Sequence, residues 1–168
     1  RIESGIGFLD HLLTSLAKHA RFDLELQCAG DLQVDDHHTA EDCALALGKA
    51  LNEALGDRRG IRRFGSAYAP LDESLARAVV DLSGRPWAEV HLDLQRPMIG
   101  QLAAENVGHV VTSLAMASRI CIHLDVIRGD NDHHKAEAAF KALALALRQA
   151  VARGRSQDIP STKGVIDA

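Results

Sequence analysis

The stretch Asp36-His37-His38-Thr39-Ala40-Glu41 occurs a second time in the chain, as Asp132-His133-His134-Lys135-Ala136-Glu137. Each copy continues into an Ala- and Leu-rich segment, which predicts a helix. On a helix, a His and a Glu four residues apart share one face, whereas the second His of each pair points about 100° away around the axis. One motif can therefore offer a His/Glu pair to one metal ion and its second His to another.

The similarity between the two halves extends beyond this motif. The segment His11-Leu12-Leu13-Thr14-Ser15-Leu16-Ala17 matches His109-Val110-Val111-Thr112-Ser113-Leu114-Ala115 at an offset of 98 residues. The alternating apolar positions of residues 22–28 match those of residues 120–126 at the same offset, and the two motifs follow at an offset of 96. A helix, a strand and a helix are thus repeated in order, which predicts an internal duplication.

Hydrophobic spacing and turn residues predict the remaining elements. Helices are expected at residues 8–20, 37–55, 102–118 and 133–152, strands at 22–28 and 120–126, and a hairpin with strands 75–82 and 87–94. Asp36 is the predicted N-cap of the second helix, Gly56 is its predicted end, and residues 57–63 form a basic linker. The fold class is therefore α+β, with helices packed on β-sheets.

A chain of 168 residues is expected to form one domain. It divides into two repeats, about 1–57 and 66–152, followed by a polar tail at 153–168. The His109 helix is preceded by the predicted hairpin, but only ten residues precede His11. The first repeat is therefore expected to lack its hairpin, which would leave an open sheet edge and an uncovered apolar face.

Composition narrows the class of protein. The net charge of −4 argues against a nucleic-acid-binding protein, which would be basic. Three cysteines without metal or redox spacing indicate a reducing, cytoplasmic location. The sequence contains no apolar run of the length that crosses a membrane and no pattern of a secretory signal.

The duplication sorts eight candidate metal ligands into two sets, each with three imidazoles and one carboxylate. The first set is His37, Glu41, His109 and His134, and the second is His133, Glu137, His11 and His38. Four protein ligands leave coordination positions open for a substrate, and this donor type suits Mn, Fe, Ni or Zn. A single His-His pair at a helix start is usually a solvated cap, but two pairs in equivalent positions favour metal binding.

The surroundings of these ligands can also be anticipated. The positive end of the helix dipole disfavours imidazolium, so the His pairs are expected to stay neutral. Four carboxylates are candidates to accept a hydrogen bond from a ligand imidazole: Asp10, Asp35, Asp72 and Asp132. The other histidines have no symmetric partner. His91 and His123 are expected on polar strand faces, and His19, close to the ligand helix, is a candidate for substrate contact.

Basic residues in loops indicate an anionic ligand. Arg63 follows the basic linker, Arg85 lies in the predicted hairpin turn, and Lys163 lies in a Ser161-Thr162-Lys163-Gly164 loop. Arginine and a Ser/Thr-Lys loop suit a phosphate group, although such residues taken singly are more often solvated surface charges.

With these motifs the sequence resembles the imidazoleglycerol-phosphate dehydratase family of histidine biosynthesis. The matching segments cover nearly the whole chain and include Gly5-Ile6-Gly7-Phe8-Leu9-Asp10-His11, Leu71-Asp72-Glu73-Ser74, Asp81-Leu82-Ser83-Gly84-Arg85-Pro86, Glu105-Asn106-Val107-Gly108-His109, both His-His motifs and Ser161-Thr162-Lys163-Gly164. The resemblance implies duplicated ββαβα halves of the ribosomal protein S5 domain 2 type. It also implies a hydro-lyase with two Mn(II) ions per active site and a homo-oligomer of 24 subunits whose active sites lie at subunit contacts.

The resemblance also implies site roles. The eight candidate ligands match the family's metal ligands, and Arg63, Arg85, Ser161 and Lys163 match positions that hold the substrate phosphate, with Thr162 between them. His19 and Lys141 match positions that line the substrate. The family also has an upstream hairpin, outside these 168 residues, whose glutamate touches the substrate.

The reaction that this resemblance implies is the removal of water from imidazole-glycerol phosphate to give imidazole-acetol phosphate. The metals would act as Lewis acids and as a template, and His11, Glu137 and Asp72 are the candidate acids and bases. Two alternatives stay open from the residues: a non-catalytic metal-binding assembly, which gives the loop cations no role, and a dimetal phosphohydrolase, which usually has more aspartate ligands.

Overall fold

The computed structural model describes residues 1–154 and 157–166. Its elements follow one another in the order β1 (Ile2–Glu3), α1 (Gly7–Ala20), β2 (Leu26–Gln27), α2 (His37–Leu55), β3 (Phe64–Leu71), β4 (Ser74–Asp81), β5 (Trp87–His91), β6 (Met98–Ile99), β7 (Leu102–Ala103), α3 (Ala104–Ser118), β8 (Cys121–Arg128) and α4 (Asp132–Ala150). Of the predicted tail at 153–168, residues 155–156 and 167–168 lie outside the described residues.

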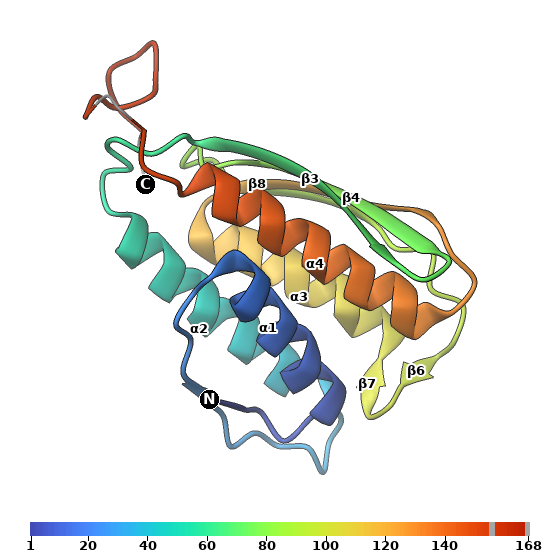
Figure 1. The fold of residues 1–168 in the computed structure, drawn as a ribbon. Helices are drawn as coiled ribbons and strands as arrows, with labels where there is room; N and C mark the ends of the chain where they lie inside the picture. Colours follow the sequence, from blue (N-terminus) through green and yellow to red (C-terminus); the bar gives the residue numbers. More distant parts are fainter. Residues whose placement is uncertain (155–156, 167–168) are drawn as a thin grey trace.

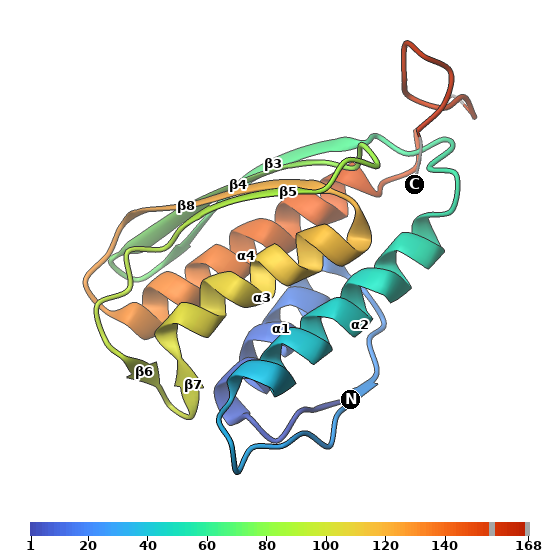
Figure 2. The same ribbon diagram turned by 180° about the vertical axis from the view of Figure 1, so that it is seen from behind.

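The molecule is built in layers (Figure 1). A four-stranded sheet covers α3 and α4, and α1 and α2 lie on the opposite side of these two helices, as the view from behind also shows (Figure 2). Helix α1 packs on α4, whereas α2 packs on α3. Each contact therefore joins a helix of the first half of the chain to a helix of the second half.

The repeated elements are equivalent in detail. Both α1 and α3 end in an arginine with a left-handed backbone, Arg21 (φ 61°) and Arg119 (φ 54°), whose N–H closes the last helical turn. These arginines are related by the same 98-residue offset that links His11 to His109. A non-glycine residue pays a cost in this conformation, so its occurrence at both ends supports a true structural repeat.

The sheet corrects the predicted hairpin at 75–94. Its strand order is β3-β4-β8-β5, so β8 lies between β4 and β5 and pairs with β5 in parallel. Strands β5 and β8 are parallel and are joined by a crossover connection that contains α3. Strand β5 therefore lies at the edge of the sheet, on the side of β8 opposite to β4. The real hairpin is formed by β3 and β4 around a two-residue turn, Asp72-Glu73, in which Asp72 has a φ of 47°.

Strand β3 was missed in the sequence because its inward side chains are small. Gly65 and Ala69 are buried, whereas Phe64, Ser66, Tyr68 and Pro70 are exposed. A Cβ at position 65 would fall against the carbonyl oxygen of Ala146 in α4, so glycine is required where this strand crosses the helix. Proline is tolerated in β3 because the strand lies at the edge of the sheet.

Three smaller predictions also need correction. The expected strand at 22–28 is regular only at Leu26–Gln27, because its neighbour β1 pairs with just these two residues. The helix predicted from residue 102 begins at Ala104, since Leu102–Ala103 form a short ladder with β6. In the linker, Arg58 is fully buried and donates to the carbonyl oxygens of Ser118 and Arg119, so it caps the end of α3 instead of facing solvent.

Candidate metal centre and phosphate pocket

Six of the eight predicted ligands lie in two groups at the same end of the helical layers. The Glu137 group consists of His11 from α1 with His133 and Glu137 from α4, and the Glu41 group consists of His109 from α3 with His37 and Glu41 from α2. Within each group the ligand atoms all lie within 4.8 Å of one another. Each group joins the two halves of the chain, as the duplication predicts.

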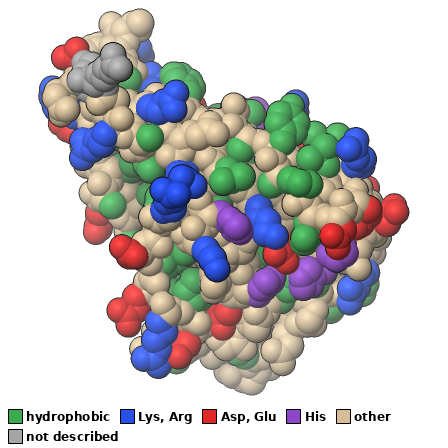
Figure 3. Space-filling model, in the orientation of Figure 1, with side chains coloured by type: hydrophobic (Ala, Val, Ile, Leu, Met, Phe, Trp, Pro, Cys, Tyr) green, Lys and Arg blue, Asp and Glu red, His purple; other side chains and the backbone are tan. Residues whose placement is uncertain are grey.

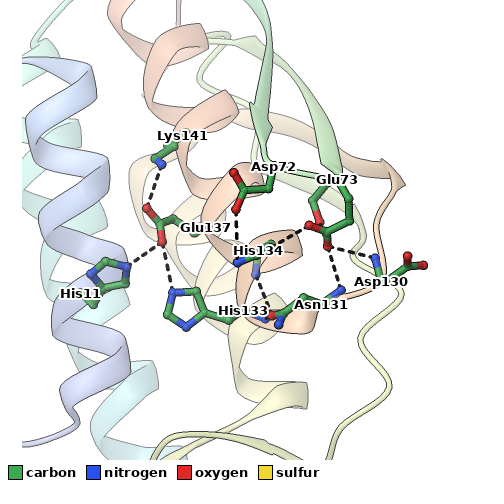
Figure 4. Close-up of polar contacts among 10 residues, drawn as sticks. His11, Asp72, Glu73, Asp130, Asn131, His133, His134, Glu137 and Lys141 are labelled. Atoms are coloured by element: carbon green, nitrogen blue, oxygen red, sulfur yellow. Dashed lines mark hydrogen bonds and ion pairs between the residues drawn. The ribbon is translucent and has the colours of Figure 1, made fainter.

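The Glu137 group is organised around one carboxylate (Figure 4). Oε2 of Glu137 lies 2.9 Å from Nε2 of His11 and 3.2 Å from Nε2 of His133, while Oε1 accepts a 2.8 Å hydrogen bond from Nζ of Lys141. Burial alone would raise the pKa of Glu137, but the hydrogen bonds from Lys141 and His11 outweigh it and lower the pKa to about 2. Glu137 is therefore ionised and ready to bind a cation.

The Glu41 group has the same ligands in different surroundings. The rings of His37 and His109 are stacked with centroids 4.7 Å apart, and Nε2 of His109 lies 3.0 Å from Oε1 of Glu41. Nδ1 of His37 lies 3.0 Å from the amide oxygen of Asn106, whose amide nitrogen donates to Asp36. This chain fixes the proton of His37 on Nδ1 and leaves Nε2 free to bind a metal.

The second histidine of each pair points away from both groups within one chain. His134 meets Glu73 of the β3–β4 turn at 2.8 Å through Nδ1 (Figure 4). In the same way, Nδ1 of His38 lies 2.9 Å from Oδ2 of Asp31, in the loop before α2. In both cases Nε2 is left for a metal ligand. Their hydrogen bonds to these carboxylates raise the pKa values of both histidines. At His38 and His134 these carboxylates therefore act against the prediction that the helix dipole keeps the His pairs neutral.

The predicted hydrogen-bond acceptors of the ligand imidazoles were also mostly wrong. Asp10 accepts from Ser4, Asp35 accepts from the backbone N–H of His37, and Asp132 accepts from the backbone N–H groups of Gln95 and Arg96. Asp36, the predicted N-cap, accepts from the backbone of Ala103 as well as from Asn106. Asp72 alone lies beside an imidazole, with Oδ2 3.9 Å from Nε2 of His134.

The residues that do accept hydrogen bonds from the candidate ligand imidazoles are Asp31, Glu73 and Asn106. Asn106 lies one helical turn before His109, which was a usable sequence signal. Asp31 lies in the loop that is two residues longer than its counterpart in the second half. Glu73 reaches His134 only because the β3–β4 hairpin extends to the start of α4, and the sequence had not revealed that hairpin.

A cavity of about 320 Å³ lies at the opposite end of α4. It is lined by Arg63, Ser83, Arg85, Ser161, Thr162, Lys163, Val165 and Ile166. All five predicted phosphate-binding residues are therefore brought together, although they come from separate loops. Arg63 is held by Asp81, with Nε 2.7 Å from Oδ1, and by the carbonyl oxygen of Pro160. Three cations and three hydroxyls around one cavity suit a phosphate group.

The remaining predicted residues lie outside this cavity. Lys141 belongs to the Glu137 group, and His19 is half-buried in the last turn of α1, two helical turns beyond His11. His91 and His123 are exposed, as predicted. Histidine side chains gather with acidic ones over one end of the molecule, near the starts of α1 and α4 (Figure 3).

Residues 4–147 match the imidazoleglycerol-phosphate dehydratase family. The chain belongs to this family. It is 57% identical over 165 residues to the imidazoleglycerol-phosphate dehydratase of Saccharomyces cerevisiae, covering 98% of this chain and 75% of the relative. It is 60% identical over 166 residues to that of Phytophthora nicotianae, where it covers 99% of this chain but only 37% of the relative.

Solved structures of the family share the fold. The imidazoleglycerol-phosphate dehydratase of Staphylococcus aureus is similar with a TM-score of 0.86 and 38% identity, covering 92% of this chain and 87% of that one. The enzyme of Pyrococcus furiosus is similar with a TM-score of 0.79 and 34% identity, covering 98% and 89%. The predicted α+β fold with duplicated halves is confirmed, and membership of the family makes the chain a dehydratase of histidine biosynthesis.

Proposed function

We propose that this chain dehydrates imidazole-glycerol phosphate with two Mn(II) ions and that each active site is shared between chains. The observation that carries this proposal is the separation of the phosphate pocket from the metal-binding groups. The backbone N–H of Arg63 donates to the carbonyl oxygen of Ala150, at the end of α4, whereas Glu137 lies in its second turn. Thirteen residues of helix correspond to about 20 Å, which a small substrate does not span.

The donor sets fit the proposed cofactor. Each group offers two imidazole nitrogens and one carboxylate oxygen within 4.8 Å. His38 and His134 lie outside both groups and engage carboxylates through Nδ1, which leaves their Nε2 atoms as further donors. A neighbouring chain that supplies His134 to the Glu41 group and His38 to the Glu137 group would complete both predicted sets. When bound, the divalent ions supply Lewis-acid stabilisation of charge on the substrate's imidazole ring.

The other residues divide the chemistry among them. Arg85 and Lys163 bind the phosphate through charge-assisted hydrogen bonds, Arg63 is oriented by Asp81, and Ser161 and Thr162 donate hydroxyl hydrogens. Dehydration requires a group that takes a proton from carbon and a group that protonates the departing hydroxyl. Asp72 suits such a role because its carboxylate is 75% exposed beside His134, whereas His11 and Glu137 are engaged with each other as ligands. The three cysteines are free in this structure, which supports a reducing, cytoplasmic setting.

The assembly is part of this proposal, because the resemblance implies 24 subunits and the separation of the half-sites requires at least two. None of the helices that the structure describes is long and apolar enough to cross a membrane. Removal of metal with a chelator is expected to dissociate the oligomer, because a bound ion stabilises only the states that bind it. Light scattering before and after chelation measures this, and a monomer under both conditions would contradict the proposal.

The direct test mixes two chains that are each impaired in a different half of the proposed site. Arg85→Ala removes one charge-assisted contact to the phosphate and is expected to weaken substrate binding by about 1.5–3 kcal/mol while metal content stays unchanged. His11→Ala removes a ligand from the Glu137 group. Oligomers that contain both variant chains should recover part of the wild-type rate of ketone formation from imidazole-glycerol phosphate, because some sites receive an intact half from each chain. No recovery in verified mixed oligomers would reject a shared site.

A further inference from the structure

The two metal-binding groups contain the same ligand types but differ in the charge beside the carboxylate. Lys141 donates to Oε1 of Glu137, four residues before it on α4, and its side chain is only 21% exposed. The equivalent position on α2, four residues after Glu41, is occupied by Leu45. Among the described residues no lysine or arginine forms an ion pair with Glu41, whose carboxylate faces His109.

The lysine affects how strongly a cation is held. Because Oε2 of Glu137 faces the two histidines and Oε1 faces Lys141, a metal ion on Oε2 leaves the ammonium group in place (Figure 4). That ion then binds a carboxylate whose charge is already partly compensated, and it is repelled by a nearby positive charge. A partly buried position reduces screening by solvent and salt, so the repulsion persists at physiological ionic strength.

The histidines assigned to complete the groups add a second difference, which rests on the function proposed above. His134, assigned to the Glu41 group, is oriented by Glu73, which is itself held by the N–H groups of Asp130 and Asn131. His38, assigned to the Glu137 group, is oriented by Asp31 in an exposed loop, and its side chain is 59% exposed against 30% for His134. A preorganised ligand loses less entropy on binding, so this difference also favours the Glu41 group.

We propose that the two metal positions have unequal affinities. The position built on Glu41 is filled first and retains its ion, whereas the position built on Glu137 is filled last and releases its ion first. Lys141 sets most of the difference. The Glu137 position is therefore the one whose occupancy responds to the supply of divalent metal.

Both affinities can be measured without turnover by titrating the metal-free full chain with Mn(II). Binding is monitored as the loss of the electron paramagnetic resonance signal of free aqueous Mn(II). The wild-type chain should bind two ions per chain in two steps. Lys141→Leu should tighten the weaker step by about tenfold or more, as expected for removal of a positive charge near a divalent ion, and bring the two steps together. His11→Ala should abolish the weaker step, and His109→Ala the tighter one.

The equivalent position on α2 provides the matched control. Leu45→Lys should weaken the tighter step by installing the same spacing of carboxylate and ammonium next to Glu41, and the double variant Leu45→Lys with Lys141→Leu should reverse the order of filling. Circular dichroism and light scattering verify that each variant folds and assembles. If Leu45→Lys does not fold, Lys141→Leu and the two His variants still decide the result.

The outcomes separate this inference from the function on which it rests. Binding of no Mn(II) by the folded wild-type chain would overturn the proposed metal sites themselves. Two ions bound with equal affinity would overturn the inequality, and loss of the weaker step in His109→Ala would overturn the proposed order of filling. Either result would leave the proposed function intact. Two unequal steps that Lys141→Leu does not change would reject the role assigned to Lys141.

Discussion

Helices α2 and α4 begin with nearly the same sequence but lie in different surroundings. Helix α4 is covered by β3 and β4 and buries twelve residues, whereas α2 packs mainly on α3 and buries only five. Even so, each helix brings its first His and its Glu to a histidine of the facing helix. The ligand geometry is therefore fixed by the start of the helix and by the helix that faces it, and it does not depend on the sheet.

The residues beside the two metal-binding groups differ, although the groups themselves are repeated. Phe8 and Asn106 occupy equivalent positions, 98 residues apart, but Phe8 packs against the His133 ring at 5.0 Å and Asn106 hydrogen-bonds to His37. Lys141 and Leu45 differ in the same manner. Duplication has preserved the candidate ligands, while the residues around them have diverged, so the two candidate metal positions are alike in composition and unlike in environment.

The largest expected effect comes from the equivalent histidines of the two groups, His11 and His109. His11→Ala and His109→Ala should each remove one metal ion per chain and reduce the rate of dehydration by about 10³-fold or more, because several kcal/mol of charge stabilisation are lost. Metal analysis after dialysis and steady-state kinetics measure this. Normal metal content in either variant would reject that histidine as a metal ligand.

The carboxylates that orient the second histidines are expected to have the next largest effect. Glu73→Gln should weaken metal binding by about 10–100-fold, because Glu73 orients His134 and also binds the loop before α4. Asp31→Asn should have a smaller effect, because His38 is more exposed. Mn(II) titration of both variants checks the order, and an equal loss would contradict the difference in preorganisation.

The packing of the two repeats predicts a smaller difference in stability. A Cβ at Gly48 of α2 would lie 2.6 Å from Cβ of Ala117, so Gly48→Ala should destabilise the metal-free chain by about 1–3 kcal/mol. The equivalent residue in α4 is the buried Ala144, and Ala144→Gly should cost about 1 kcal/mol through helix propensity. Urea unfolding compares them, and a stable Gly48→Ala variant would show that the two helices tolerate the same packing.

The smallest expected effect concerns acid stability. The folded-state pKa of Glu137 is about 2, below its ordinary value of 4.5, so its stabilising effect is present above about pH 4.5 and is lost as the pH falls toward 2. Lys141→Leu should remove about 0.5 kcal/mol of the metal-free chain's free energy of unfolding at neutral pH and less at about pH 3. Urea unfolding at the two pH values measures this difference, and an equal loss at both would contradict the pair's contribution.

The sequence predicted the parts of the site that the duplication determines. The pairing of His11 with Glu137 and of His109 with Glu41 followed from symmetry, because an error in one half would have broken the match in the other. The basic loop residues indicated only an anionic ligand, and their assignment to one phosphate pocket followed from the resemblance, since Arg63, Arg85 and Lys163 come together through the path of separate loops.

What the sequence did not reveal depends on contacts between distant segments. Strand β3 has small inward residues because α4 crosses it closely, so its hydrophobic pattern is weak. In the sequence, Arg58 is part of a basic linker, and its burial depends on a contact with the end of α3 that the sequence does not show. Glu73 and Asp31 orient equivalent histidines from a hairpin turn and a loop, and no repeat links these two positions.

Helix α4 also fixes the distance between two functional regions of the chain. It carries His133 and Glu137 of the Glu137 group near one end and meets Arg63 at the other, so one rigid element separates this group from the cavity that contains Arg63. In the proposed shared site, these two parts of one chain serve different active sites. Inserting a single residue between Glu137 and Ala150 would shift these half-sites by about 1.5 Å and rotate them by about 100° relative to each other. If the sites are shared as proposed, the length of α4 sets the spacing between neighbouring active sites.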